Sequence, residues 1–134
     1  MLDKTFESIK FLMENTYTST NAVGFALVDA GGNMLGECGD VDLPMIAESV
    51  SLICARSREL YTFLNGINDD EICLFSEGTR GRFAIYSVSK SVFMVMLFPK
   101  TVDIFRIKEN LDKTASKMRE LFNTMSAGRG SCRL

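Results

Sequence analysis

Three apolar segments joined by very short turns constrain the fold more than any other feature of the sequence. They are residues 71–77 (EICLFSE), 81–89 (GRFAIYSVS) and 91–98 (SVFMVMLF). Turns of this length connect only antiparallel neighbours, so the three segments are predicted to form an antiparallel meander. Met94 and Met96 on the last segment are predicted as core residues and not as a soft ligand pocket, because methionine fills irregular gaps between strands and helices.

A glycine pair in the stretch FALVDAGGNMLGE, residues 25–37, raises the question of a phosphate-binding loop. Walker and Rossmann loops place their glycines at the start of a helix, whose N–H groups point at the anion. The residues after Gly32 have no helical apolar period and no Lys-Ser/Thr pair. The glycines are therefore predicted to turn a β-hairpin between strands 22–29 and 33–38. The first strand is apolar on both faces, so it is predicted to be covered on both sides.

Helical periodicity marks both ends of the chain. An amphipathic helix is predicted over about the first fifteen residues, ended by the polar stretch NTYTSTN. A final helix is predicted from 104 to about 125, with Glu109 and Lys113 on its solvated face. The apolar stripes are Leu2, Phe6, Ile9 and Met13, with Leu12 at the edge, and Ile104, Ile107, Leu111, Ala115, Met118, Phe122 and Met125. Residues 1–125 are expected to form one domain, and 126–134 (SAGRGSCRL) a flexible tail.

A long helix is predicted from Asp42, as N-cap, to residue 65, with Gly66 as the C′ glycine. One stripe is predicted to face the core: Ile46, Val50, Ile53, Leu60 and Leu64. A second apolar line comprises Met45, Leu52 and Phe63, bordered by the small residues Ser51, Ala55 and Thr62. A helix with one buried face needs only one such line. The second line could pack inside its own protomer, but a subunit interface is favoured, because small residues let another helix approach closely.

Composition excludes several classes of function. The formal net charge of −2 offers no basic field for nucleic acid, and no apolar run approaches the ~20 residues of a membrane helix, so a cytoplasmic protein without membrane insertion is predicted. The N-terminus lacks the apolar segment of a signal peptide. The four cysteines, Cys38, Cys54, Cys73 and Cys132, form no CxxC pair, and the 134 residues include no histidine. Histidine-based catalytic dyads are therefore excluded, and we expect no enzyme activity, cofactor or metal.

The element order is helix, two strands, long helix, three-stranded meander, helix, which predicts an α+β fold with one five-stranded antiparallel sheet flanked by helices. The hairpin GFALVDAGGNMLGE, the helix MIAESVSLICARSRELYTFL and the strands EICLFSEGTRGRFAIYSVS and SVFMVMLF together resemble the roadblock, or dynein light chain, domain. The resemblance covers residues 2–125. It implies a profilin-like fold and a non-enzymatic module.

The resemblance also implies partners. Roadblock domains form homodimers or heterodimers in which the long helices lie side by side and the third strands pair across the two-fold axis. They regulate or scaffold small Ras-like GTPases, in some cases stimulating hydrolysis, or serve as adaptors. The residues that this arrangement places near the dimer axis are Met45, Leu52, Ala55, Phe63, Ile72, Cys73, Leu74 and Phe75.

Charged residues beside this predicted interface are the candidates for contact with a GTPase. They are Glu48, Arg56, Arg58 and Glu59, which flank the predicted two-fold patch. Arg80 and Arg82, in the stretch EGTRGRF, could act as arginine fingers in phosphoryl transfer. A solvated hairpin tip is the favoured interpretation of those two arginines.

Two alternatives remain open at this point. A ligand-sensing domain of the PAS or GAF type also wraps helices around an antiparallel sheet, but it needs a cavity with converging polar groups. The strand candidates for such groups are Ser76, Tyr86 and Ser87, of which strand alternation sends the last two to opposite faces. The other alternative is a purely structural light chain, which would dimerise without distinguishing GTP-bound from GDP-bound partners.

Overall fold

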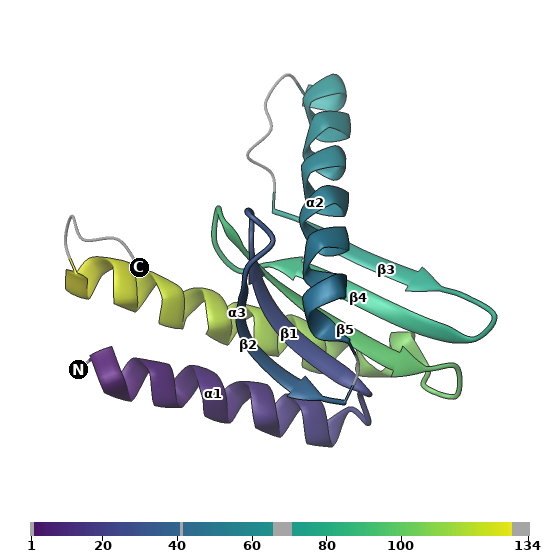
Figure 1. Cartoon of the computed structure of the whole chain (residues 1–134), viewed down its shortest axis with the longest axis horizontal. Helices are drawn as coiled ribbons and strands as arrows, with labels where there is room; N and C mark the ends of the chain where they lie inside the picture. The colour runs from purple at the N-terminus through teal and green to yellow at the C-terminus, as the bar shows by residue number, and fades with distance from the viewer. Residues whose placement is uncertain (1, 41, 66–70, 130–134) are drawn as a thin grey trace.

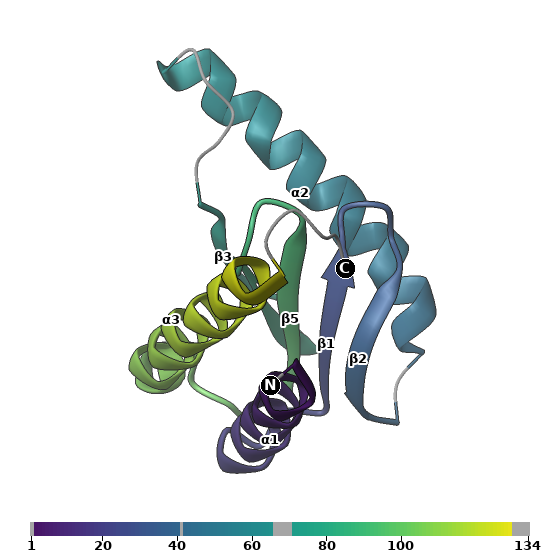
Figure 2. The ribbon, with the colours of Figure 1, turned by 90° about the vertical axis from the view of Figure 1, so that its left-hand side faces the viewer.

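Five antiparallel strands form one sheet between two layers of helices, in a computed structural model that describes residues 2–40, 42–65 and 71–129 (Figure 1). The elements are α1 (Leu2–Ser19), β1 (Gly24–Asp29), β2 (Met34–Gly39), α2 (Leu43–Asn65), β3 (Cys73–Glu77), β4 (Gly81–Ser87), β5 (Val92–Pro99) and α3 (Ile104–Arg129). The strand order is β2-β1-β5-β4-β3. Helix α2 crosses one face of the sheet, and α1 and α3 cover the other (Figure 2). The predicted fold class and element order are confirmed.

The central strands β1 and β5 are buried on both faces and separate two cores. On the side of α1 and α3, Phe25, Met94 and Met96 pack against Met118 and its neighbours. On the other side, the core lies under α2 and includes Val28, Val50, Ile85 and Phe93. Because both predicted methionines are fully buried, their assignment as core residues is confirmed.

The glycine pair turns the β1–β2 hairpin, as predicted. Asp29 Oδ1 accepts hydrogen bonds from the backbone N–H groups of Gly31 and Asn33, each at 2.9 Å. Gly32 has a φ of 84°, in the region that glycine adopts most readily. The ladder is then interrupted on β2, because Leu27 pairs with Gly36 while Val28 pairs with Met34. Leu35 is the extra residue of this β-bulge, and its side chain is exposed.

The terminal helices are longer than predicted. Helix α1 continues through the threonine-rich segment to Ser19, because Thr18 Oγ1 donates to the carbonyl of Glu14 at 2.9 Å and Thr16 is buried against α3. Between the two helices the hydroxyls of Thr16 and Thr114 are hydrogen-bonded at 3.0 Å. Helix α3 runs to Arg129, so it includes residues expected in the tail, and 130–134 lie outside the described residues. The division into a domain over 1–125 and a tail over 126–134 stays a prediction.

The core-facing stripe of α2 differs from the prediction. The side chain of Asp42 caps the helix as expected, accepting the N–H of Met45 at 3.4 Å, whereas Gly66 lies outside the described residues. The buried residues are Leu43, Ala47, Val50 and Cys54. Of the predicted stripe only Val50 is buried; Ile46 and Ile53 are half-buried, and Leu60 and Leu64 are exposed. The reason is that α2 packs on β1 and β2 and then extends past the sheet, where no other helix or strand of the described residues covers it (Figure 2).

Candidate functional site

The outer face of α2 carries large apolar side chains that are exposed to solvent. The side chains of Met45, Leu52 and Phe63 are 68%, 59% and 88% exposed, and Ala55 beside them is exposed as well. The alternative in which this line packs inside its own protomer is therefore wrong. We call Met45, Leu52, Ala55 and Phe63 the outer face of α2. Such a row of large apolar groups on one helix face is typical of an interaction surface.

Three of the four charged candidates lie on the same side of the helix. Glu48, Arg56 and Glu59 are exposed and stand four or seven positions from Leu52, a spacing that places them beside it. Arg56 and Glu59 form an ion pair of 3.0 Å with each other. The predicted dimer contacts and the predicted GTPase contacts therefore share one helix face, which the sequence interpretation treated as two adjoining regions.

Arg58 points elsewhere. Its Nη1 donates to the carbonyl of Lys90 at 2.9 Å, and its guanidinium carbon lies 5.1 Å from the centroid of the Phe93 ring. These contacts tie α2 to the turn between β4 and β5. Arg58 would have to leave both of them to reach a partner on the outer face of α2.

Strand β3 lies at the border of the sheet opposite β2. Within the described residues β3 pairs with β4 alone, in a regular register from Cys73 opposite Tyr86 to Glu77 opposite Arg82. Cys73 is exposed, and Leu74 and Phe75 are half-buried. Ile72 is fully buried, and Ser87 holds both of its backbone groups: the hydroxyl accepts the Ile72 N–H at 2.7 Å, and the Ser87 N–H donates to the Ile72 carbonyl at 2.9 Å. Ile72 therefore has no side-chain surface to offer a partner.

The two arginines of the β3–β4 hairpin differ in their surroundings. Arg80 is exposed at the tip, as the solvated interpretation predicts. Arg82 donates to the carbonyl of Lys100 and lies 3.8 Å from Glu77, with its side chain largely covered. Arg82 is therefore held along the sheet and does not project as a free finger.

Two of the three polar groups considered for a sensor domain, Tyr86 and Ser87, are occupied by structural contacts. Tyr86 Oη donates to Asp112 Oδ1 at 2.5 Å, and Lys108 Nζ lies 2.9 Å from Asp112 Oδ2. Burial, followed by the bond to Asp112, raises the pKa of Tyr86. Burial also raises the pKa of Asp112, but hydrogen bonds from Lys108 and Tyr86 outweigh it and leave that pKa below its ordinary value. Tyr86 and Ser87 face opposite sides of the sheet, and Ser76 is half-buried on β3, so these groups do not converge on a cavity.

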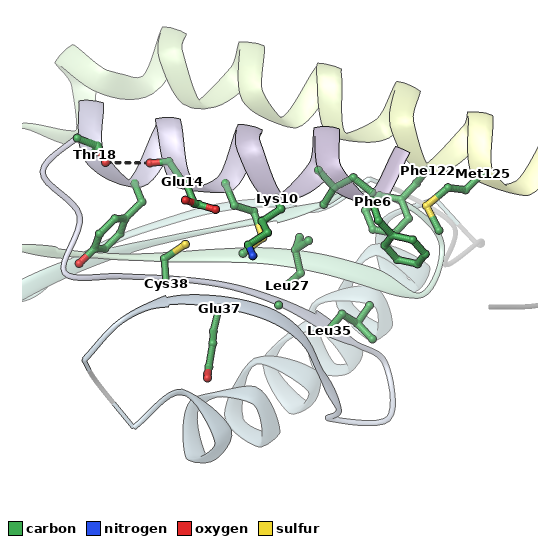
Figure 3. Close-up of a pocket in the computed structure, with 14 residues that line it drawn as sticks. Phe6, Lys10, Glu14, Thr18, Leu27, Leu35, Glu37, Cys38, Phe122 and Met125 are labelled. Atoms are coloured by element: carbon green, nitrogen blue, oxygen red, sulfur yellow. Dashed lines mark hydrogen bonds between the residues drawn. The ribbon is translucent and has the colours of Figure 1, made fainter. Parts of the chain in front are cut away.

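A pocket of about 950 Å³ lies instead between α1, β2 and the end of α3 (Figure 3). Its apolar lining is Phe6, Ile9, Met13, Leu27, Leu35, Phe122 and Met125, and its polar lining is Lys10, Glu14, Tyr17, Thr18, Glu37 and Cys38. Gly36 contributes to the hollow, because a Cβ there would lie 3.2 Å from the sulfur of Met13. The sequence interpretation missed this pocket. Two features of the sequence could have indicated it: a glycine within a strand, and polar residues spaced four positions apart on a helix flank that is otherwise apolar.

The pocket concentrates charges around Cys38. Burial raises the pKa of this thiol, the carboxylates of Glu14 and Glu37 raise it further, and the ammonium of Lys10 lowers it. Glu14 lies on α1, whereas Glu37 pairs with Ala26, which belongs to the core under α2, so the Glu37 side chain is on the other face of the sheet from the thiol (Figure 3). The thiol is therefore kept protonated near neutral pH and is a poor nucleophile.

Other kinds of site find no support in the described part of the chain. Across residues 2–40, 42–65 and 71–129, no three His, Cys, Asp or Glu side chains are grouped so that they could hold a metal ion. None of the helices described combines the length and apolar character needed to cross a bilayer.

The three-layer arrangement, with one helix on one face of a five-stranded antiparallel sheet and two on the other, is the profilin-like fold of roadblock domains. Among solved structures it is similar to MglB of Myxococcus xanthus, with a TM-score of 0.80 and 20% identity over 90% of this chain and 91% of that one. A structure described as MglB with tetrameric arrangement gives a TM-score of 0.79 and 18% identity, over 90% of this chain and 92% of that one. A Roadblock/LC7 domain from Streptomyces avermitilis gives a TM-score of 0.70 and 12% identity, over 84% of this chain and 95% of that one.

Identities at this level show the fold alone. No protein-family model matches the sequence, and no curated protein sequence matches it. What the chain does must therefore be argued from its own surfaces.

Proposed function

We propose that the chain is a dimeric, non-enzymatic roadblock-type module that binds a small Ras-like GTPase in the cytoplasm as a regulator or scaffold. The single observation that carries the proposal is the row of exposed apolar side chains on the outer face of α2. The similarity to MglB, including the structure with tetrameric arrangement, supports assembly through self-association.

Self-association through α2 explains why its apolar side chains face outward. Burying one side chain of the size of Met45, Leu52 or Phe63 contributes roughly 1.5–3 kcal/mol, and a two-fold interface buries each of them twice. Ala55 lets the second helix approach closely. A gain of this size offsets the loss of translational and rotational freedom on association.

The β3 edge would extend the same interface. Its regular register leaves a row of outward backbone groups on Cys73–Glu77, to which the equivalent strand of a second chain can pair. Cys73, Leu74 and Phe75 would then lie near the two-fold axis. Ile72 would make no side-chain contact with the partner, because its side chain is buried and both of its backbone groups are hydrogen-bonded within the protomer.

The GTPase would meet the rim of the paired helices. When the apolar line is covered by a second α2, Glu48, Arg56 and Glu59 remain at its border, where charged groups steer association and set specificity. Of the sequence candidates these three are retained, and Arg58 is assigned instead to holding α2 on the sheet. A regulator would distinguish the nucleotide states of its GTPase, whereas a structural light chain would not.

The test compares Leu52→Glu with Phe11→Glu, which changes another exposed apolar side chain, on α1 and on the opposite side of the sheet. Light scattering over a concentration series is expected to show a dimer for the wild type and for Phe11→Glu, and a folded monomer for Leu52→Glu. Candidate GTPases loaded with GDP or a GTP analogue are then offered to the dimer, with Arg56→Glu expected to weaken capture. A wild type that stays monomeric at high concentration would refute the proposed interface.

A further inference from the structure

The pocket between α1 and β2 has no part in the proposed dimerisation or GTPase binding. It opens on the side of the sheet covered by α1 and α3, whereas the outer face of α2 is on the other side (Figures 2 and 3). Its volume of about 950 Å³ is in the range of sites for small organic ligands. Any ligand of this pocket is therefore inferred independently of the proposed function.

The shape of the pocket limits what can enter it. At the mouth, the side chains of Phe6 and Leu35 are 51% and 50% exposed. The side chains that form the floor are only 2–6% exposed, so the hollow narrows toward them. These floor residues are Ile9, Met13, Leu27, Phe122 and Met125. A partner helix, about 10 Å across, is too wide to reach this floor, whereas a single alkyl chain is slender enough.

The floor is apolar, and the polar groups of the lining stand away from it. Lys10, Glu14 and Thr18 are exposed on α1, and the Thr18 hydroxyl already donates to the carbonyl of Glu14. The half-buried Tyr17 and Cys38 pack against the apolar core. Water at such a floor finds few hydrogen-bonding partners, so an apolar group that displaces it gains affinity.

The charges at the rim select neither sign. Lys10 and Glu14 stand four positions apart on α1 and carry opposite charges. The Glu37 side chain lies on the other face of the sheet, because Glu37 pairs with Ala26 of the core under α2. A ligand is therefore recognised by its apolar body, and its head group stays in solvent.

The length of the pocket favours an extended chain. Its lining follows α1 over twelve residues, from Phe6 to Thr18, a distance of about 18 Å. Phe122 and Met125 lie toward one end, and Thr18 toward the other (Figure 3). The methionines of the floor have flexible thioether side chains, which adapt to apolar ligands. A peptide strand is disfavoured, because it would need a continuous row of backbone partners on β2 and the bulge interrupts that row.

We propose that the pocket between α1 and β2 binds the unbranched alkyl chain of a free single-chain lipid. The chain lies along α1, and its methyl end contacts Phe122 and Met125. The head group lies in solvent beside Glu14 and Thr18.

The first experiment titrates the wild-type chain by calorimetry with alkyl maltosides, from hexyl to dodecyl, below the concentration at which each forms micelles. Saturable binding of one molecule per chain is expected. Affinity should rise about twofold to fourfold for each added methylene, the upper figure corresponding to a methylene that is fully buried. No saturable binding, or an affinity that is independent of chain length, would overturn the proposal.

The head group is tested with three decyl compounds: the neutral maltoside, decylamine and decanoate. Their affinities are expected to lie within about fivefold of one another, because exposed ion pairs contribute at most about 1 kcal/mol each and the rim carries one charge of each sign. A preference for one sign of charge well beyond tenfold would contradict a head group in solvent and overturn the proposal.

A matched pair of variants locates the chain. Phe6 and Phe11 are both exposed aromatic residues of α1, but only Phe6 lines this pocket, whereas Phe11 lines a separate groove between α1 and α3. Phe6→Ser is expected to weaken decyl maltoside binding about tenfold, because an apolar contact area is lost, and Phe11→Ser should bind like the wild type. Equal affinity of the two variants would contradict the assigned site. The chain-length series uses the wild type alone and tests the proposal even if a variant fails to fold.

Thiol chemistry gives a second, independent location. Cys38 lines the pocket, whereas Cys73 is exposed on β3, at the opposite border of the sheet. At saturation, decyl maltoside is expected to slow alkylation of Cys38 by iodoacetamide at least several-fold and to leave the rate at Cys73 unchanged. Peptide mass spectrometry measures both rates, at a mildly alkaline pH where a thiol of raised pKa still reacts. Equal effects at the two cysteines, or none at Cys38, would place the chain elsewhere and overturn the proposal.

Discussion

The buried threonine pair between α1 and α3 gives a direct test of how α1 is held against the rest of the fold. Thr16 and Thr114 are almost fully buried, and their hydroxyls are hydrogen-bonded at 3.0 Å across 98 residues of sequence. Replacing one threonine by valine preserves the side-chain shape and leaves the other hydroxyl without this partner. Replacing both removes the polar pair and leaves two methyl groups in contact.

The expected free energies differ sharply between single and double variants. Each single variant should lose about 1–2 kcal/mol of unfolding free energy, because a buried hydroxyl that loses its partner retains its desolvation cost. The double variant should lie within about 0.5 kcal/mol of the wild type, since two apolar groups of the same shape replace the pair. The coupling free energy is then about 1.5 kcal/mol or more, well above the scatter of additive sites.

Urea unfolding followed by circular dichroism at one fixed protein concentration measures all four chains of this cycle. In thermal unfolding the Tm of each single variant should fall by about 3–8 °C, and the Tm of the double variant should lie close to that of the wild type. Additive losses, with the double variant worse than either single one, would show that the two hydroxyls are not coupled. The placement of α1, and with it one wall of the pocket, would then be refuted.

Two further predictions concern the hairpin and the acid limb of stability. Gly39→Ala should lower the free energy of unfolding, measured in urea, by about 2 kcal/mol or more, because φ is 106° there and a Cβ would lie 2.4 Å from the carbonyl oxygen of Val23. Gly31→Ala should cost less, because Gly31 has no positive φ and a Cβ there would approach only the side chains of Asn33, at 3.3 Å, and Asp29, at 3.4 Å. Backbone and side-chain hydrogen bonds from Asn33 lower the pKa of Asp29, and the pKa of Asp112 is lowered too. Both carboxylates thus stabilise the fold above their ordinary pKa of 3.8, and unfolding free energy should fall as pH drops from about 5 to 2, less steeply in Asp29→Asn.

Local pattern was sufficient for the sheet and for the apolar face of α3. The short turns between residues 71 and 98 permit only antiparallel neighbours, and the apolar positions of α3 from Leu111 to Met125 repeat at a helical period, so both predictions hold. The exposure of the second apolar line on α2 could also be predicted, because one helix cannot bury two apolar stripes against a single sheet.

Contacts between residues far apart in the sequence could not be predicted from local pattern. Periodicity groups Leu60 and Leu64 with Val50, but it does not report that the sheet ends before their turns of the helix. Arg58 looks like a solvated charge until its partners, 32 and 35 positions away, are in place. The pocket depends on the bulge at Leu35 and on the gap beside Gly36, neither of which leaves a periodic signal.

The two borders of the sheet are unequal, and this inequality limits how many copies can assemble edge to edge. The bulge disrupts the border at β2, whereas the border at β3 keeps a regular ladder. A chain with two regular borders can add neighbours without end and grow into a fibre. A chain with one can meet a second copy, and the pair then presents only disrupted borders to solution. If the proposed pairing through β3 forms, growth through the sheet would stop at two, and larger assemblies would have to be built through helices.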